Sequence, residues 1–234
     1  MSDLQLRPAG VEDLEAVLAV NLASRAGAER SGAMPPGIHD DLDVRRWVLS
    51  WDLSQQDVWL AELDGRPVGY ARATATWLDD LYVVPDAAGH GVGGALLDLV
   101  KGLRPAGFCL WVFESNTPAR AFYEHRGLVA LERTDGEGNE EKSPDIKMAW
   151  PGEQPLSFFR GLIDEVDEQL GDLLARRAAL TRAVQPHKTD PGRDPARERA
   201  IAEALALRAP ALGPDRLARI VSTIITESLD AAGD

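Results

Sequence analysis

The sequence predicts two domains of different fold class: an α+β domain over residues 1–151 and an all-α domain of three helices over residues 156–234, joined by a linker at 152–155. Three observations lead to this prediction. Up to residue 150, short runs rich in β-branched and aromatic residues alternate with amphipathic helical segments, as in an α+β fold. A glycine-rich turn at residues 89–94 joins one such run to a helix. Beyond residue 155 no strand-like run remains, and Ala, Leu, Arg and acidic residues dominate.

The strands and helices of the first domain follow from hydrophobic periodicity and turn residues. Asp64-Gly65 lies between two strand-like runs and is typical of a tight hairpin, so we expect a mostly antiparallel sheet. Strands are expected at 4–7, 58–62, 68–76, 81–84, 108–113, 128–133 and 146–150. Helices are expected at 11–25, 44–51 and 118–126, and directly after the glycine turn.

One long helix dominates the predicted second domain. Apolar residues recur at three- and four-residue steps from Phe159 to Val184, which predicts a helix of about 28 residues. A helix of this length exceeds what one small domain can bury, so we expect a bundle or a partner chain. Asp194 and Pro195 indicate the start of a second helix, as its N-cap and first residue. A third helix is expected at 215–229.

Composition and charge exclude several classes of function. The net charge of −13, most of it in the first 150 residues, argues against nucleic acid or an anionic membrane as a partner and is compatible with a cationic substrate. The single cysteine, Cys109, is expected to be a buried strand residue, and the four scattered histidines show no metal-ligand spacing. No membrane span or signal peptide is visible, so we expect a cytoplasmic protein without a metal.

The glycine turn predicts a binding site for a phosphate or diphosphate. Its glycines let the backbone approach a ligand, and the following helix start offers unpaired N–H groups. Gly89, Gly91 and Gly94 also fit the dinucleotide pattern G-x-G-x-x-G, with Glu114 at the matching distance. That alternative is disfavoured because residues 85–88 separate the first glycine from its strand. A tight turn that binds nothing stays open on this stretch alone.

A second motif follows the strand expected at 108–113. The stretch from Asn116 to Gly127 reads N-x-x-A-x-x-F-Y-x-x-x-G. Together with the glycine turn, and in the same order along residues 1–150, it resembles the GNAT superfamily of N-acetyltransferases. The resemblance implies direct transfer of an acetyl group from acetyl-CoA to a small-molecule amine, without a covalent enzyme intermediate.

The resemblance also implies roles for individual residues. Tyr123 would protonate the departing thiolate. The proton of the amine would go to Asp79, Asp80 or Glu114. Where the family's loop usually begins with Arg or Gln, this chain has Ala88, which should weaken CoA binding without abolishing it. The acetyl-CoA site would be formed by Leu81, Val83, Gly89, Gly91, Gly93, Gly94 and Asn116.

Charged residues of the helical domain indicate a second site. At about 100° per residue, Arg177 and Lys188 differ by about 20° and share one helix face. Arg160 points about 100° away and would more easily reach the site of a second chain. A face of the next helix carries three further charged residues, Asp194, Arg197 and Glu198. Arginines directed at one place suit a small dicarboxylate, and the alternative is a solvated charged face.

The spacing of these residues is specific. It reads R-x-x-I-D-x-x-D-x-x-L-x-x-L-L-x-x-R from Arg160 to Arg177, followed by Lys188, R-D-P-A-R-E at 193–198 and I-I-x-E-S-L at 224–229. This pattern resembles the all-helical, AroQ-type chorismate mutases. The resemblance implies an interlaced homodimer of three-helix chains that rearranges chorismate to prephenate without a cofactor.

The second resemblance likewise implies residue roles. Arg177 and, from the partner chain, Arg160 would hold the two carboxylates of chorismate, and Lys188 would donate to the ether oxygen as its C–O bond breaks. The substrate site would be completed by Asp194, Arg197, Glu198 and Ser228. Two departures would slow the mutase: Ala232 replaces a second ether-oxygen donor, and Pro186 is expected to kink the long helix.

Three functions stay open for the helical domain. In the first alternative, the domain is a mutase that acts on chorismate, and the chain is bifunctional. Alternatively, it is a dimerisation or chorismate-sensing module that controls the acetyltransferase. The third alternative is an enzyme for isochorismate or amino-deoxychorismate.

Overall fold

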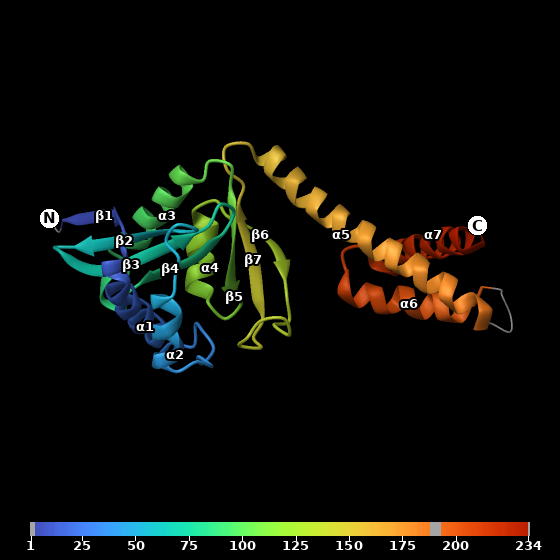
Figure 1. The fold of residues 1–234 in the computed structure, drawn as a ribbon, viewed down its shortest axis with the longest axis horizontal. Helices are drawn as coiled ribbons and strands as arrows, with labels where there is room; N and C mark the ends of the chain where they lie inside the picture. Colours follow the sequence, from blue (N-terminus) through green and yellow to red (C-terminus); the bar gives the residue numbers. More distant parts are fainter. Residues whose placement is uncertain (1–2, 188–192, 234) are drawn as a thin grey trace. The chain divides into compact units, whose positions relative to one another are not determined.

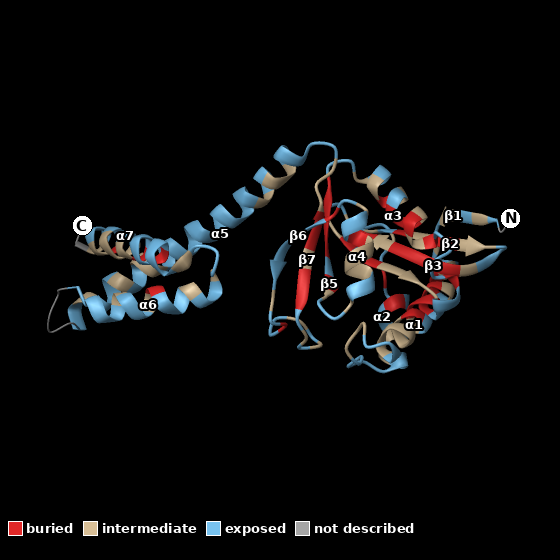
Figure 2. Ribbon diagram, turned by 180° about the vertical axis from the view of Figure 1, so that it is seen from behind, coloured by how far each residue is buried: buried red, intermediate tan, exposed pale blue. Residues whose placement is uncertain are grey.

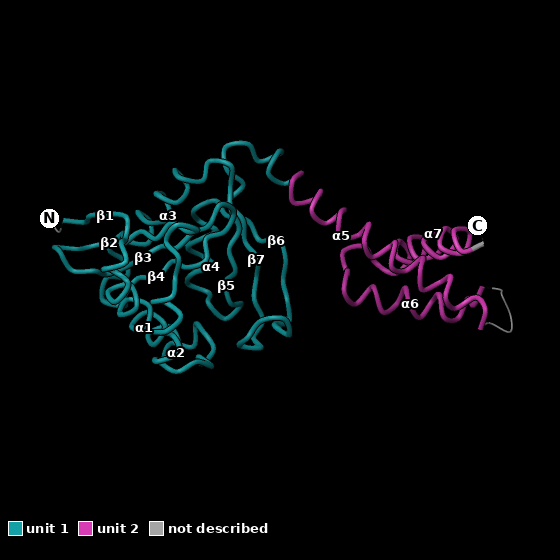
Figure 3. Tube along the Cα trace, in the orientation of Figure 1, with its two compact units in different colours: residues 1–159 teal, residues 160–234 magenta. Residues whose placement is uncertain are grey.

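The structure is a computed structural model that describes residues 3–187 and 193–233, and it divides into two compact units, Met1–Phe159 and Arg160–Asp234 (Figure 3). Helix α5 (Pro155–Val184) begins in the first unit and continues into the second. Lys188, which the sequence predicts as the donor to the ether oxygen, lies outside the described residues.

The first unit contains a four-stranded antiparallel sheet in the order β1-β2-β3-β4 (Figure 1). Its strands are β1 (Leu4–Pro8), β2 (Asp57–Leu63), β3 (Arg66–Ala73) and β4 (Leu78–Val83). The predicted hairpin between β2 and β3 is confirmed: Asp64 and Gly65 both have positive φ angles, 52° and 76°. Two successive positive φ values match the twist of a two-residue hairpin turn.

A second sheet of three antiparallel strands has the order β5-β7-β6. These strands are β5 (Phe108–Phe113), β6 (Val129–Arg133) and β7 (Asp145–Trp150). Among the described residues, the two sheets join only at a parallel bridge between Trp77 and Cys109, where the Cys109 amide donates to the Thr76 carbonyl oxygen at 2.9 Å. Beyond this bridge β4 and β5 part, so the β4 edge that faces β5 has no strand partner (Figure 1).

Helices cover both faces of the four-stranded sheet (Figure 2). One hydrophobic cluster packs α1 (Leu14–Arg30) and α2 (Asp41–Leu49) against side chains such as Leu60 and Tyr70. The other packs α3 (Val92–Leu103) against the opposite face, including Ala61 and Ala71, and extends to the second sheet. Adjacent residues of a strand therefore belong to different hydrophobic clusters, because successive side chains of a strand point to opposite faces of the sheet.

Three helices of the first unit have boundaries that differ from the prediction. Helix α1 starts at Leu14 after a 3₁₀ turn at Val11–Asp13 and continues to Arg30. Helix α2 starts at Asp41, earlier than predicted, because the Asp40 side chain accepts hydrogen bonds from two amides of the first turn. Helix α4 (Thr117–His125) begins one residue early for the same reason: Asn116 caps it by accepting from the Ala119 amide.

The second unit consists of the greater part of α5, α6 (Pro195–Arg208) and α7 (Gly213–Gly233). The predicted cap of α6 is confirmed, since the Asp194 side chain accepts from the amides of Ala196 and Arg197. The predicted kink at Pro186 is wrong. Helix α5 has already ended at Val184, and Pro186 lies in a 3₁₀ turn, because proline has no N–H with which to continue an α-helix. No described helix is long and apolar enough to cross a membrane.

Candidate active sites

The glycine turn presents a row of amides that helix α3 cannot pair. Gly89 and Gly91 have φ angles of 79° and 83°, and Gly91 is the N-cap of α3. The first amide bonded to the cap carbonyl is that of Ala95, so the amides of residues 92–94 precede the first intrahelical hydrogen bond. N–H groups of this kind, together with the positive end of a helix dipole, are suited to bind an anion.

A cleft of about 570 Å³ opens over this turn. Helix α1, strand β4, the glycine turn and helix α4 all contribute to its walls. All seven residues predicted for the acetyl-CoA site line it together: Leu81, Val83, Gly89, Gly91, Gly93, Gly94 and Asn116. The cleft thus joins the amides that suit a diphosphate to the open edge of β4.

The wall formed by α1 was not foreseen from the sequence. Ser24, only 7% exposed, lines the cleft, and its hydroxyl has no hydrogen-bond partner although it is buried. Gly27 lies on the same wall, and a Cβ there would come within 2.6 Å of the Pro85 ring. Small residues at three- and four-residue steps are the only sequence feature that marks this wall. Such a stripe is equally typical of ordinary helix packing.

Tyr123 is buried at 8% exposure, on helix α4 beside Phe122. Burial raises the pKa of Tyr123 well above its ordinary value, and the nearby Tyr82 hydroxyl and Asp80 carboxyl raise this pKa further. The phenol therefore stays protonated at neutral pH. Its electrostatic neighbours both belong to β4, the strand that borders the cleft. Tyr123 itself is not among the described residues that line the cleft, whereas the adjacent Phe122 is.

The three carboxylates considered as bases lie in different surroundings. Asp80 is buried, and its Oδ2 accepts from Arg72 Nε at 2.5 Å; burial raises the pKa of Asp80 more than Arg72 lowers it. Asp79 is exposed, and partial desolvation raises its pKa as well. Glu114 pairs with Arg133, its Oε1 lying 2.6 Å from Nη1. Asp79 and Asp80 both belong to β4, which borders the cleft, whereas Glu114 follows β5.

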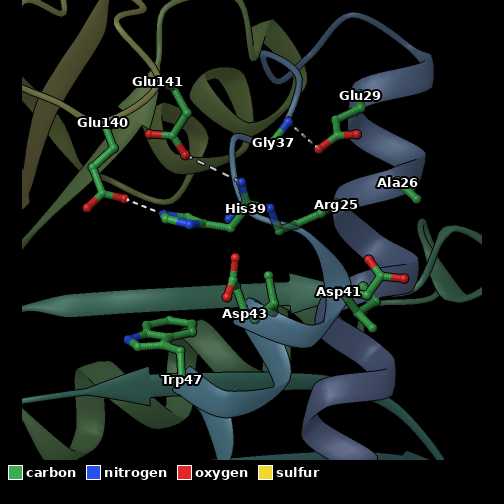
Figure 4. A pocket seen from close by; sticks show the side chains of 12 residues that line it. Arg25, Ala26, Glu29, Gly37, His39, Asp41, Asp43, Trp47, Glu140 and Glu141 are labelled. Carbon is green, nitrogen blue, oxygen red and sulfur yellow. Dashed lines mark hydrogen bonds and ion pairs between the residues drawn. The ribbon is translucent and has the colours of Figure 1, made fainter.

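A second hollow, of about 770 Å³, lies beside α1 and α2 (Figure 4). Two ion pairs cross it: Arg25 to Glu141 at 3.4 Å and His39 to Glu140 at 3.0 Å (Figure 4). The indole of Trp47, 44% exposed, forms part of the wall. Five carboxylates border the hollow, Glu29, Asp41, Asp43, Glu140 and Glu141. Carboxylates therefore outnumber the cationic side chains that line it.

The second unit contains a hollow of about 820 Å³ between its three helices. The structure brings four of the predicted chorismate-site residues to its wall: Arg177, Asp194, Arg197 and Glu198. Arg177 Nη1 donates to the hydroxyl of Ser228 at 2.5 Å and to the Ile224 carbonyl at 3.1 Å, so the buried Ser228 lies directly behind it.

Arg193 is a member of this hollow that the sequence prediction missed. Its guanidinium pairs with Glu198 at 2.6 Å and also donates to Ser222 and Thr226 on α7. The hydrogen bond from Arg193 lowers the pKa of Glu198. Arg160 does not line the hollow: it lies 17 residues before Arg177 on α5, about 25 Å away along the helix axis.

Comparison with known proteins identifies both halves of the chain. Residues 54–128 match the family model of the acetyltransferase (GNAT) domain. Peptidyl-lysine N-acetyltransferase YjaB of Salmonella typhimurium is 30% identical over 100 residues, which are 42% of this chain and 68% of that protein. This chain belongs to the GNAT acetyltransferases. Matched segments span from about half to all of the curated relatives' own lengths.

The helical unit of this GNAT acetyltransferase matches a different family model. Residues 159–232 match the family model of type II chorismate mutases. The chain is therefore an enzyme: an N-acetyltransferase that carries a chorismate mutase domain.

Solved structures agree on the fold of the acetyltransferase half. A GCN5-related N-acetyltransferase from Rhodopseudomonas palustris superposes with a TM-score of 0.52 at 27% identity, covering 64% of this chain and 97% of that one. The acetyltransferase yncA of Salmonella typhimurium, solved with its cofactor acetyl-CoA, superposes with a TM-score of 0.50 at 16% identity, covering 64% and 94%. At 16% identity, the similarity to yncA shows only that the two proteins share a fold.

Proposed function

We propose that the first unit binds acetyl-CoA in the 570 Å³ cleft and transfers its acetyl group to a cationic amine. The observation that carries this proposal is the convergence of all seven predicted residues on one cleft. The diphosphate would accept hydrogen bonds from the amides of the glycine turn, and the pantetheine arm would pair with the unpartnered edge of β4 at Leu81 and Val83. The structure of yncA, which shares the fold and was solved with its cofactor acetyl-CoA, is consistent with this assignment.

During the transfer the attacking amine loses one proton and the departing thiolate gains one. The reacting amine, in its deprotonated form, attacks the thioester carbonyl carbon with its nitrogen lone pair, and the C–S bond breaks as the amide forms. Tyr123, kept protonated by its raised pKa, gives its proton to the thiolate. The proton released by the amine passes to Asp79 or Asp80 through water. Glu114 is the weaker candidate for this base because Arg133 already holds it.

The acidic hollow of Figure 4 is the proposed acceptor site. Five carboxylates attract a positively charged molecule. The indole of Trp47 already has the Arg72 guanidinium 5.1 Å from its ring centroid, and its exposed part would contact the apolar chain of such a molecule. Arg25 and Glu141 of this hollow also lie within electrostatic range of Tyr82, which in turn neighbours Tyr123. We infer that the acceptor is a primary amine with further positive charge, such as a polyamine or a lysine side chain in a peptide.

For the second unit we propose rearrangement of chorismate to prephenate in the 820 Å³ hollow. Arg177 would hold one carboxylate, and Arg160 of a second copy would hold the other. Lys188 would donate to the ether oxygen, while Asp194, Arg197, Glu198 and Ser228 would complete the site. Ala232 in place of a second donor would slow the reaction, since loss of one such donor costs about 3–4 kcal/mol in other enzymes.

We propose that the second unit forms a homodimer along α5. None of the 30 residues of this helix is buried, although an apolar stripe runs along it. Its large exposed apolar side chains are Leu156, Ile163, Val166, Leu170, Leu173, Leu174, Leu180 and Val184. A helix with such a stripe is stabilised by packing against another element, and a second copy would supply both that packing and the missing Arg160.

Two assays on one purified protein test these proposals. Release of CoA is measured against a panel of amines with wild type and Tyr123→Phe, and loss of chorismate is followed by its ultraviolet absorbance with wild type and Arg177→Ala. We expect cationic amines to be the best acceptors, and each variant to lose only its own activity. Chorismate that changes the KM for acetyl-CoA without being consumed would favour the sensing module instead. Turnover of isochorismate or amino-deoxychorismate alone would favour the third alternative.

A further inference from the structure

The cofactor cleft has a single ionisable side chain on its wall, that of Arg126. The remaining lining residues are apolar, small or uncharged polar. A coenzyme A diphosphate brings negative charge into a domain that already holds most of the chain's net charge of −13. Backbone amides supply hydrogen bonds and a partial charge, but no full positive charge. The cleft therefore needs a cation, and only one described residue on its wall can provide it.

Arg126 follows helix α4, and its guanidinium packs on the first turn of α3. Its Nη2 lies where a Cβ on residue 94 would be, so Gly94 leaves room for the guanidinium. The guanidinium also lies over the Phe122 ring, 5.6 Å from the centroid, and pairs with Asp98, Nη1 to Oδ2, at 2.8 Å. Arg126 Nη1 also donates to the Gly94 carbonyl oxygen at 3.5 Å, so these contacts hold the charge against the first turn of α3.

The glycine turn itself supplies no fixed cation. No Lys or Arg occurs from residue 84 to residue 94, and the first loop position of the family motif is Ala88. His90 is the one basic residue of the turn, and its Nδ1 faces the Ala88 carbonyl oxygen at 3.0 Å. A second observation concerns the α1 wall of the cleft: the hydroxyl of Ser24, one of the lining residues, is buried and has no hydrogen-bond partner.

We propose that Arg126 is the cationic partner of the cofactor diphosphate and replaces, from helix α4, the basic side chain that Ala88 does not provide. This inference rests on the proposed function, because it assumes that the cleft holds acetyl-CoA. A guanidinium can bind two phosphate oxygens at once, and in doing so Arg126 shares or exchanges its contact with Asp98. Arg126 positions the cofactor and takes no part in acetyl transfer itself.

The test compares three acetyl donors with wild type and Arg126→Ala. Acetyl-CoA and acetyl-dephospho-CoA both contain the diphosphate, whereas S-acetylpantetheine has no phosphate. We expect Arg126→Ala to raise the Kd of both diphosphate donors by about tenfold to a hundredfold, the effect of one charge-assisted contact. The KM for S-acetylpantetheine and the kcat at saturation should not change. An equal loss for all three donors, a loss confined to acetyl-CoA, or no loss overturns the proposal.

Control variants separate this inference from folding and from the proposed function. Asp98→Asn removes the partner of Arg126 and should leave CoA binding as tight or tighter. Ala88→Arg in the Arg126→Ala background should restore binding of the diphosphate donors. If Arg126→Ala does not fold, Arg126→Gln keeps the stem over Phe122 and is expected to show the same loss. Wild type that binds no CoA at all refutes the proposed function, whereas wild-type binding that Arg126 does not affect refutes only this inference.

Discussion

Gly27 of helix α1 lies directly against Pro85 of the loop that follows strand β4: a Cβ on Gly27 would approach the Pro85 Cγ to 2.6 Å. The proline ring cannot rotate away as a long side chain would. This contact therefore sets the distance between α1 and the glycine turn, and with it the width of the cofactor cleft.

We expect Gly27→Ala to destabilise the protein by about 1–3 kcal/mol, because overpacking outweighs the gain in helix propensity. Gly102 in helix α3 is the matched control, since nothing lies within 4 Å of its Cβ position, and Gly102→Ala should stabilise by about 0.5–1 kcal/mol. Urea unfolding measures both. If the two variants prove equally stable, α1 is not fixed by this contact.

The acidic hollow predicts a charge-specific effect on the acceptor. Asp41→Asn with Glu140→Gln should raise the KM for a diamine several-fold, with little change in kcat, and should leave a neutral amine unaffected. Added salt should reduce the difference, because exposed charges are screened over about 8–10 Å. Glu132→Gln, an exposed carboxylate on β6, is the control. An identical rise for the neutral amine would place the acceptor elsewhere.

The exposed apolar side chains of α5 predict that the protein is a dimer. Leu170→Glu with Leu173→Glu should convert a dimer to a monomer in analytical ultracentrifugation, because two charges would replace exposed apolar side chains at the proposed interface. Mutase activity should then be lost, since Arg160 of the second copy no longer reaches the site, while acetyl transfer continues. Gln169→Glu on the same helix controls for added charge. A monomeric wild type with full mutase activity would contradict the proposal.

The ion pair of Arg7 with Asp13 predicts a pH dependence of stability. Hydrogen bonds from Arg7 lower the pKa of Asp13 to about 2 in the folded protein, below its ordinary value of 3.8. A lowered folded pKa stabilises the protein above about pH 4, and this stability is lost as the pH falls towards 2. Asp13→Asn should therefore reduce stability at pH 6 and flatten its decline in acid, measured by thermal unfolding. Glu12→Gln, the exposed neighbour, should keep the wild-type profile.

Local sequence patterns predicted those features that depend on neighbours in the chain. The Asp64-Gly65 hairpin and the Asp194 cap of α6 are each decided within a few residues, and the structure confirms both. The glycine turn and Asn116 lie in motifs, so the prediction that they belong to one cofactor site needed no knowledge of distant contacts.

The features that the sequence did not predict depend on contacts between residues that are distant in the chain. Ser24 and Arg126 reach the wall of the cleft only after folding. Ser24 belongs to a stripe of small residues that is equally typical of helix packing, and Arg126 stands at an unspecified position of the motif at 116–127. Arg193 stands in the quoted motif, but its pairing with Glu198 and with α7 is a tertiary contact. The sequence also did not predict the separation of β4 from β5. The residue pattern of a strand indicates which of its faces is buried, but not which strand it pairs with.

The unpartnered edge of β4 has a consequence for the empty enzyme. An exposed strand edge is a template on which another chain can add a strand, and such edges promote aggregation. The pantetheine arm would occupy this edge as a missing strand would. Bound acetyl-CoA would then protect this strand edge as well as donate the acetyl group, and the protein should aggregate more slowly in storage when it is saturated with acetyl-CoA.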